Sequence, residues 1–229
     1  MAVIKPIVTA LILCVQLSGA LRAATPEGGE KHPLPRVLVI GDSISEGYIK
    51  PLAELLKDKA AVERPRENCG SSRRILDHLD QFLGDTRWDV IQFNCGIHDL
   101  RYLNAERKPA APKDGGKHQV PLDEYRANLN KIVDRLKKTR ASLIWCSTTP
   151  LNTKVPYWVA DDVARYYEVA AEVMRNEGVP IADLNAKILK RGTPKWSPDG
   201  VHFTPEGSQE LAEELVPEIG KTLSARTRR

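Results

Sequence analysis

The sequence predicts an α/β protein built around a parallel sheet. Apolar runs typical of buried strands alternate along the chain with amphipathic segments that have helical spacing. This alternation implies β-α-β crossovers, which connect parallel strands. A chain of 229 residues with 41% hydrophobic content is long enough and apolar enough for one domain with a sizeable core.

The first predicted strand and helix flank a Gly-Asp-Ser turn. Residues 36–41 (RVLVIG) form a continuous apolar run, as in strands that are covered on both faces. Residues 48–60 have helical spacing, with their leucines on one side. Ser43 lies between the two elements, where a serine can either cap the helix or act as the attacking group of an enzyme.

The second and third strands surround a helix. Residues 62–68 predict a short edge strand, which Pro65 and the neighbouring charges weaken. Residues 71–83 predict a helix with a serine cap at its start and Gly84 as its stop. Residues 88–96 (WDVIQFNCG) form a strong strand.

A long connection precedes the next helix. Residues 101–121 are polar and basic, and a loop of that length in a compact domain is either functional or disordered. Its His118 is expected to be solvated. Residues 122–139 predict an amphipathic helix, and residues 141–150 predict a strand that ends at a proline.

The remaining elements complete the alternation. Residues 161–178 predict a helix that stops at a glycine, and residues 179–184 predict a short strand. The final helix covers residues 204–223, with Thr204 as its cap and Pro205 at its first position. The sequence therefore contains five predicted strands.

The N-terminus predicts export. Residues 1–20 contain an early lysine, an apolar run and small residues, which is the anatomy of a secretory signal peptide. The apolar run is shorter than the roughly 20 residues of a membrane span, although an uncleaved anchor stays open as an alternative. Residues 21–35 are interpreted as a linker and residues 36–225 as the folded domain. We expect a secreted or periplasmic protein without stable membrane association after signal cleavage.

Charge, cysteine content and motif spacing do not predict a nucleic-acid partner, a disulfide framework, a metal or a cofactor. The 34 basic and 30 acidic residues give a net charge of +4, a mixed surface that does not predict nucleic-acid binding. After signal cleavage three cysteines remain, and Cys69, Cys95 and Cys146 are expected to be buried and unpaired. No metal-ligand spacing and no G-x-G-x-x-G phosphate cradle appears, so we predict no metal site and no cofactor. The sequence does not predict an oligomeric state.

Four blocks of polar residues are expected at the carboxyl edge of the sheet, where ligands bind in open parallel sheets. They are residues 41–43 (GDS), 68–70 (NCG), 96–99 (GIHD) and 199–202 (DGVH). Together these blocks resemble those of the SGNH (GDSL-type) hydrolases, a family of esterases and lipases, over roughly residues 36–216. The resemblance implies a flavodoxin-like, three-layer α/β/α sandwich with a central, mostly parallel five-stranded sheet.

The resemblance also implies a catalytic triad. Carried over to this sequence, it makes Ser43 the nucleophile, His202 the general base and Asp199 the partner that orients the histidine. These residue types suit the chemistry, because a serine hydroxyl needs a base and a carboxylate fixes the imidazole tautomer. Alternatively, His202 only packs at the start of the last helix, and Asp199 only forms the turn.

The predicted oxyanion hole departs from the family pattern. The resemblance implies donors from the Ser43 backbone, the Gly70 backbone and an Asn side chain, but His98 stands where the family has Asn. A histidine ring N–H can still donate, so we predict that His98 is a donor. The alternatives are a purely structural role for His98 and a plain turn glycine for Gly70. Asp42 and Asp99 are predicted to support these turns without taking part in the chemistry.

The resulting expectation is a serine esterase that cleaves small acyl groups, most simply acetyl, from a small-molecule or glycan ester. The polar, basic 101–121 segment offers no slot for a long acyl chain. The alternatives are a lysophospholipase or thioesterase of the same family, and a non-catalytic carbohydrate-binding relative with an altered oxyanion hole.

Overall fold

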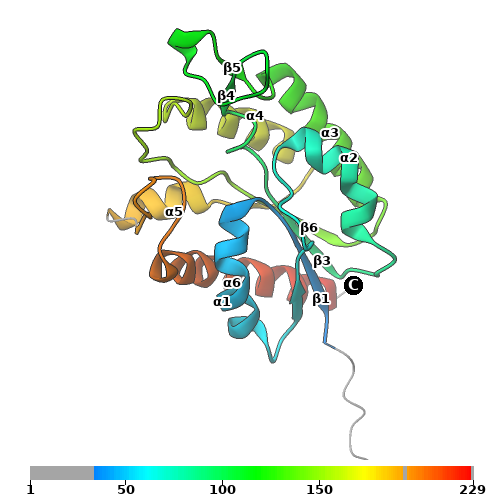
Figure 1. Cartoon of the computed structure of the whole chain (residues 1–229). Helices are drawn as coiled ribbons and strands as arrows, with labels where there is room; N and C mark the ends of the chain where they lie inside the picture. Colours follow the sequence, from blue (N-terminus) through cyan, green and yellow to red (C-terminus); the bar gives the residue numbers. More distant parts are fainter. Residues whose placement is uncertain (1–33, 193–194, 228–229) are drawn as a thin grey trace, which may run out of the picture. The chain divides into compact units, whose positions relative to one another are not determined.

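The computed structural model of the protein describes residues 34–192 and 195–227 (Figure 1). The chain divides into two units, Met1–Pro33 and Leu34–Arg229, and every described helix and strand belongs to the second unit. The predicted signal peptide, and the predicted linker up to residue 33, lie outside the described residues.

A five-stranded sheet forms the centre of the second unit. Its strand order is β2-β1-β3-β6-β7, and each neighbouring pair is parallel. The strands are β1 (Arg36–Ile40), β2 (Ala61–Glu63), β3 (Val90–Phe93), β6 (Ser142–Cys146) and β7 (Ile181–Ala182). The predicted second strand is therefore shorter than expected and ends before Pro65, which cannot donate to the strand ladder.

Helices cover both faces of the sheet (Figure 1). They are α1 (Ser43–Leu56), α2 (Ser72–Leu83), α3 (Leu122–Lys137), α4 (Asp162–Asn176), α5 (Leu184–Arg191) and α6 (Pro205–Thr227). Helix α1 packs against α6 on one face, while α2, α3 and α4 pack in sequence on the other. The predicted three-layer α/β/α sandwich is thus confirmed. Within the described residues, no helix combines the length and the apolar character needed to cross a membrane.

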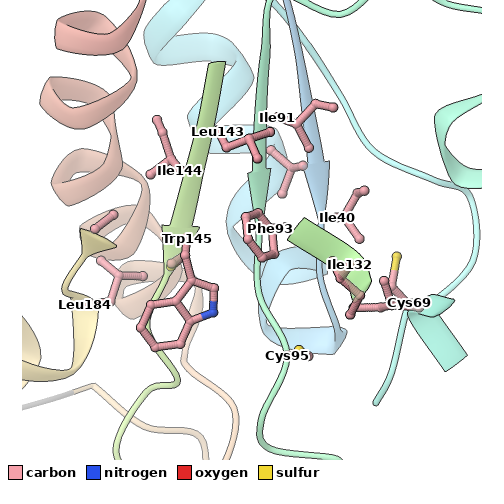
Figure 2. Packing of buried hydrophobic residues seen from close by; sticks show 14 of the residues in the cluster. Ile40, Cys69, Ile91, Phe93, Cys95, Ile132, Leu143, Ile144, Trp145 and Leu184 are labelled. Carbon is pink, nitrogen blue, oxygen red and sulfur yellow. The ribbon is translucent and has the colours of Figure 1, made fainter. Parts of the chain in front are cut away.

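The core lies between the sheet and these helices. Strand β3 is buried along its whole length, and four of the five residues in each of β1 and β6 are buried. Figure 2 shows side chains of the three strands packing with Ile132 of α3 and Leu184 of α5, which come from the two helical layers. Cys69, Cys95 and Cys146 are buried and unpaired, as predicted. Trp145 of β6 is fully buried.

Backbone hydrogen bonds hold the loops together at the carboxyl edge of the sheet. The N–H of Cys69 donates to the carbonyl of Gly41 at 3.2 Å, which joins the loops after β2 and β1. The block at residues 199–202 is bound to the segment after β6, because the N–H of Asn152 donates to the carbonyl of Gly200 at 2.8 Å. The parallel topology therefore gathers polar blocks that are far apart in sequence.

Helix α1 begins five residues earlier than predicted. Asp42 has extended backbone and its Oδ1 accepts from the N–H of Ile44 at 3.0 Å, so Asp42 is the N-cap of this helix. The prediction of a start at Tyr48 was wrong because the helical leucine pattern begins only at Leu52, ten residues after Asp42. Ser43 is consequently the first residue of the helix and does not cap it.

The segment 101–121 is structured. Strands β4 (Tyr102–Leu103) and β5 (Lys117–His118) pair antiparallel, with a short 3-10 helix at Pro112–Asp114 between them. The expectation that His118 is solvated was wrong: its side chain is 16% exposed, and Nε2 lies 2.9 Å from Oδ2 of Asp162. The hydroxyl of Tyr102 donates to the same carboxylate oxygen at 2.8 Å, so both strands are tied to the start of α4.

Helix α5 was not predicted. Asp183 caps it, because its Oδ1 accepts from the N–H of Ala186 at 3.0 Å, and Gly192 ends it with a left-handed backbone. Both residues are ordinary helix boundary signals, but with only eight residues between them the hydrophobic periodicity is too short to detect.

Candidate active site

Ser43 lies at the carboxyl end of β1, where the chain turns into α1. Its Oγ is 2.8 Å from Nε2 of His202, although the two residues are 159 positions apart. As the first residue of α1, Ser43 has a backbone N–H without an acceptor inside the helix. Both the hydroxyl and the amide are thus available for chemistry at this edge.

His202 stands between Ser43 and a carboxylate. Its Nδ1 lies 2.6 Å from Oδ2 of Asp199, on the side of the ring opposite to the Ser43 contact. This bond places the proton on Nδ1 and leaves Nε2 as the acceptor for the serine hydroxyl. The structure therefore brings Ser43, His202 and Asp199 into one hydrogen-bonded line.

The Asp199 turn requires glycine. Gly200 has a φ of +67°, and a Cβ there would lie 2.1 Å from the carbonyl oxygen of Asn152. Oδ1 of Asp199 accepts from the N–H of Val201 at 2.9 Å and from that of His202 at 3.0 Å. The turn thus fixes the carboxylate independently of its bond to the imidazole ring.

The same contacts explain the ionisation of Asp199. Partial burial acts to raise its pKa, but the hydrogen bonds from the His202 side chain and from the backbone of Val201 and His202 outweigh burial. The pKa falls to about 2 as a result. Asp199 is therefore a carboxylate, and it stabilises positive charge on His202, throughout the neutral range.

Gly70 follows β2 at the same edge with a φ of +63°, which favours glycine. Its N–H, however, is already engaged: it donates to Oδ1 of Asn68 at 2.9 Å. This contact was not predicted from the sequence, although an Asn two residues before a glycine is a known turn signal. Donation to a ligand would need Asn68 to turn away or to share the hydrogen.

His98 follows β3 and lines a groove together with Gly70. Burial, together with the charges of Arg101 and His202, lowers the pKa of His98 to about 4. Its ring nitrogens make no hydrogen bond to another described residue. His98 is consequently a neutral imidazole at neutral pH with one N–H to donate.

Asp99 braces the two loops that carry Gly70 and His98. Its carboxylate accepts from the N–H of Ser72 at 2.9 Å and from the Ser72 hydroxyl, at the start of α2. The amide of Asn128 on α3 donates to the same hydroxyl at 3.0 Å. Asp99 is fully buried, and burial raises its pKa to about 7 against the hydrogen bonds from Ser72.

This shift predicts how stability depends on pH. The folded state keeps a proton on Asp99 that the unfolded state releases above pH 4, so raising the pH toward 7 favours unfolding. We expect Asp99→Asn, which cannot titrate, to lose less stability than the parent between pH 5 and pH 8, by the order of 1–3 kcal/mol. Urea unfolding at both pH values measures the difference. Equal losses in both proteins would contradict the assignment.

Asp42 lies behind the serine turn and is 1% exposed. Its Oδ1 caps α1, while Oδ2 has no hydrogen-bond donor among the described residues. Burial raises the pKa of Asp42 to about 6, although the Ile44 N–H bond and the charge of His202 oppose the rise. Asp42 therefore supports the turn and makes no hydrogen bond with the hydroxyl of Ser43.

Trp158 is a second residue whose role at this edge the sequence did not reveal. Its indole N–H donates to the carbonyl of Ile97 at 3.1 Å, so the segment after β6 holds the loop that carries His98. In the part of the chain that the structure describes, no three side chains of His, Cys, Asp or Glu converge as metal ligands.

Fold and site together define a carboxylic ester hydrolase of the SGNH type. The profile of the GDSL-like Lipase/Acylhydrolase family matches residues 39–210. The chain belongs to this family.

Comparisons with individual proteins agree. The chain is 31% identical over 207 residues to the GDSL esterase/lipase WDL1 of Oryza sativa subsp. japonica, covering 80% of this chain and 76% of the relative. It is 25% identical over 226 residues to the isoamyl acetate-hydrolyzing esterase 1 homolog of Rattus norvegicus, covering 83% and 84%.

Solved structures share the fold. An acetylxylan esterase from Geobacillus stearothermophilus matches with a TM-score of 0.66 at 22% identity, over 83% of this chain and 97% of the other. The acetyl xylan esterase AlAXEase matches with a TM-score of 0.65 at 15% identity, over 80% and 99%.

Proposed function

We propose that the protein is an exported serine esterase that removes acetyl groups from carbohydrate through an acyl-enzyme. The observation that carries the proposal is the hydrogen-bonded line from Ser43 through His202 to Asp199, with distances of 2.8 and 2.6 Å. A hydroxyl, a base and an orienting carboxylate in this order are the parts that nucleophilic acyl transfer needs.

In the proposed mechanism Oγ of Ser43 attacks the ester carbonyl while Nε2 of His202 takes the hydroxyl proton. The tetrahedral intermediate collapses by breaking the bond to the alcohol oxygen, which leaves with the proton from His202. Water then attacks the acyl-enzyme, again giving a proton to His202, and acetate departs as that proton returns to Ser43. Asp199 stabilises the imidazolium in both halves.

The oxyanion of both intermediates would be held by three donors. The backbone N–H of Ser43 and the ring N–H of neutral His98 have no hydrogen-bond acceptor among the described residues. The Gly70 N–H joins them only after Asn68 releases it. We therefore infer that substrate binding moves the Asn68 side chain, since contacts in an unliganded site often tighten only with substrate bound.

The neighbouring groove favours a polar substrate. It has a volume of about 640 Å³, its lining includes Gly70 and His98, and every other lining residue is polar. A long acyl chain would need an apolar slot, whereas sugar hydroxyls suit such walls. The rat relative is named for isoamyl acetate and the structural neighbour AlAXEase for acetyl xylan, and both names contain the acetyl group.

Export is proposed from the sequence. Residues 1–20 have the anatomy of a signal peptide, and a polysaccharide substrate lies outside the cell. Detection of the mature protein in the periplasm or the medium, with an N-terminus near residue 21, tests this part.

The acyl preference gives a direct test. Because the groove lacks an apolar slot, we expect kcat/KM for p-nitrophenyl esters to fall at least about tenfold between acetate and octanoate. Acetate release from acetylated xylo-oligosaccharide should accompany the activity on p-nitrophenyl acetate. A higher kcat/KM for octanoate would instead indicate a lipase or lysophospholipase.

The role of Ser43 as the nucleophile has a test that does not depend on the substrate. A fluorophosphonate probe reacts with an activated serine, so it should label Ser43 and no other serine, as read by mass spectrometry of the peptides. A labelled peptide that lacks Ser43, or no labelling at all, would contradict this role.

A further inference from the structure

The groove beside the proposed oxyanion hole has walls from two separate elements. One wall comes from α2 and the loop before it, and the other from Arg107 and Gln119 of the 101–121 segment. Figure 1 shows β4 and β5, which belong to that segment, beyond the carboxyl ends of the sheet strands. A substrate that occupies the groove therefore contacts this segment as well as Gly70 and His98.

The arginines of the groove differ in their partners. Arg73 donates twice to the carboxylate of Glu124, at 2.8 and 2.7 Å, and Arg74 pairs with Glu67 at 2.5 Å. Their charges are thus already balanced. The guanidinium of Arg107 has no hydrogen bond or ion pair with any described residue. Asp77 is the lining carboxylate without such a partner.

Arg107 is held in an unusual position. It lies in a tight turn, closed by hydrogen bonds between the backbones of Asn104 and Lys108 at 2.8 Å and from the Arg107 N–H to the Asn104 carbonyl at 3.0 Å. Its φ is +61°, a left-handed backbone that is uncommon for arginine and occurs often at ligand sites. The turn therefore presents one unpaired cation at the groove wall.

The base of the hairpin is anchored. Tyr102 and His118 both bond the buried carboxylate of Asp162, which Arg165 also contacts at 3.1 Å. The hairpin segment as a whole is basic, with five lysines and arginines against two acidic residues between positions 101 and 121. The 101–121 segment is therefore anchored where β4 and β5 pair, and it carries an excess of positive charge.

We propose that Arg107 binds a carboxylate of the substrate, so that the groove takes an acetylated glycan that contains uronic acid residues. This inference rests on the proposed function, and it names the class of glycan. A guanidinium fork matches a carboxylate in a bidentate pair. Asp77 in the same groove opposes a dianion such as phosphate more strongly than a single carboxylate.

The test compares two substrates of the same shape. One is an O-acetylated oligogalacturonide, and the other is the same oligosaccharide with its carboxylates converted to primary amides. We expect the parent to release acetate from the acid with a KM about fivefold to tenfold lower than from the amide, at similar kcat. Added salt should reduce this preference, because the groove is open to solvent.

Variants assign the preference to one residue. Arg107→Gln should remove the preference by raising KM for the acid alone, while Asp77→Asn should increase it about twofold. Lys108→Gln, the matched control from the adjacent position outside the groove lining, should keep the parent preference.

The outcomes separate the two proposals. If the parent cleaves acid and amide equally well, or if Arg107→Gln keeps the preference, the inference falls while carbohydrate deacetylation stands. If neither oligosaccharide, nor acetylated xylo-oligosaccharide, releases acetate although p-nitrophenyl acetate is hydrolysed, the proposed carbohydrate function fails together with the inference.

Discussion

Replacing Ser43 with alanine is expected to lower kcat for p-nitrophenyl acetate by about 10⁴- to 10⁶-fold, while KM changes little. The substitution removes the one oxygen that lies 2.8 Å from Nε2 of His202. It leaves the backbone N–H and the Asp42 cap of α1 in place. The residual rate over water would come from substrate binding and the remaining oxyanion donors.

Stability and a nearby serine provide the controls. Ser43→Ala should unfold at a temperature close to that of the parent, since the hydroxyl is not part of the helix cap. Ser197→Ala changes a serine in the same turn as Asp199, where the backbone and not the side chain makes the contacts. It should retain nearly full activity. A Ser43→Ala protein with parental kcat would show that the hydrolysis uses another nucleophile.

The second large effect is expected at His98. His98→Ala should lower kcat by about 10²- to 10³-fold, the usual cost of losing one oxyanion donor. His98→Asn should stay within about tenfold of the parent, because an amide N–H can replace the ring N–H. His78→Ala is the matched control, since His78 lines the same groove on α2 and its Nδ1 bonds the Arg74 carbonyl instead.

A pH profile tests whether the ring of His98 stays neutral during turnover. Because the pKa of His98 is about 4, its ring is neutral from pH 5 to 8. The activity profiles of the parent and of His98→Asn should therefore have the same shape in that range. Full activity in His98→Ala would remove this residue from the oxyanion hole, and a profile that changes shape would show that His98 titrates during turnover.

Local sequence patterns predicted much of the fold for physical reasons. Buried strands of a parallel sheet are apolar on both faces, so β1, β3 and β6 stand out as continuous runs. Helix α3 stands out through its amphipathic spacing. By contrast, α5 and the β4–β5 hairpin were missed because elements of two to eight residues contain too few positions to show a period.

Chain order and residue type pointed to a shared edge for Ser43, Gly70, His98 and His202, because parallel strands end on the same side of a sheet. They also pointed to the contact between Asp199 and His202, which lie three positions apart. These inferences depend on topology and local turn chemistry alone. Topology and local turn chemistry can both be predicted from the order and spacing of the residues.

Only the tertiary structure decided which groups touch. It joined Ser43 to His202 across 159 positions, occupied the Gly70 N–H with Asn68, and buried His118 against Asp162. Such contacts depend on strand register, loop paths and side-chain rotamers acting together. A shift of an ångström or two would make or break each bond, and residue spacing carries no information at that scale.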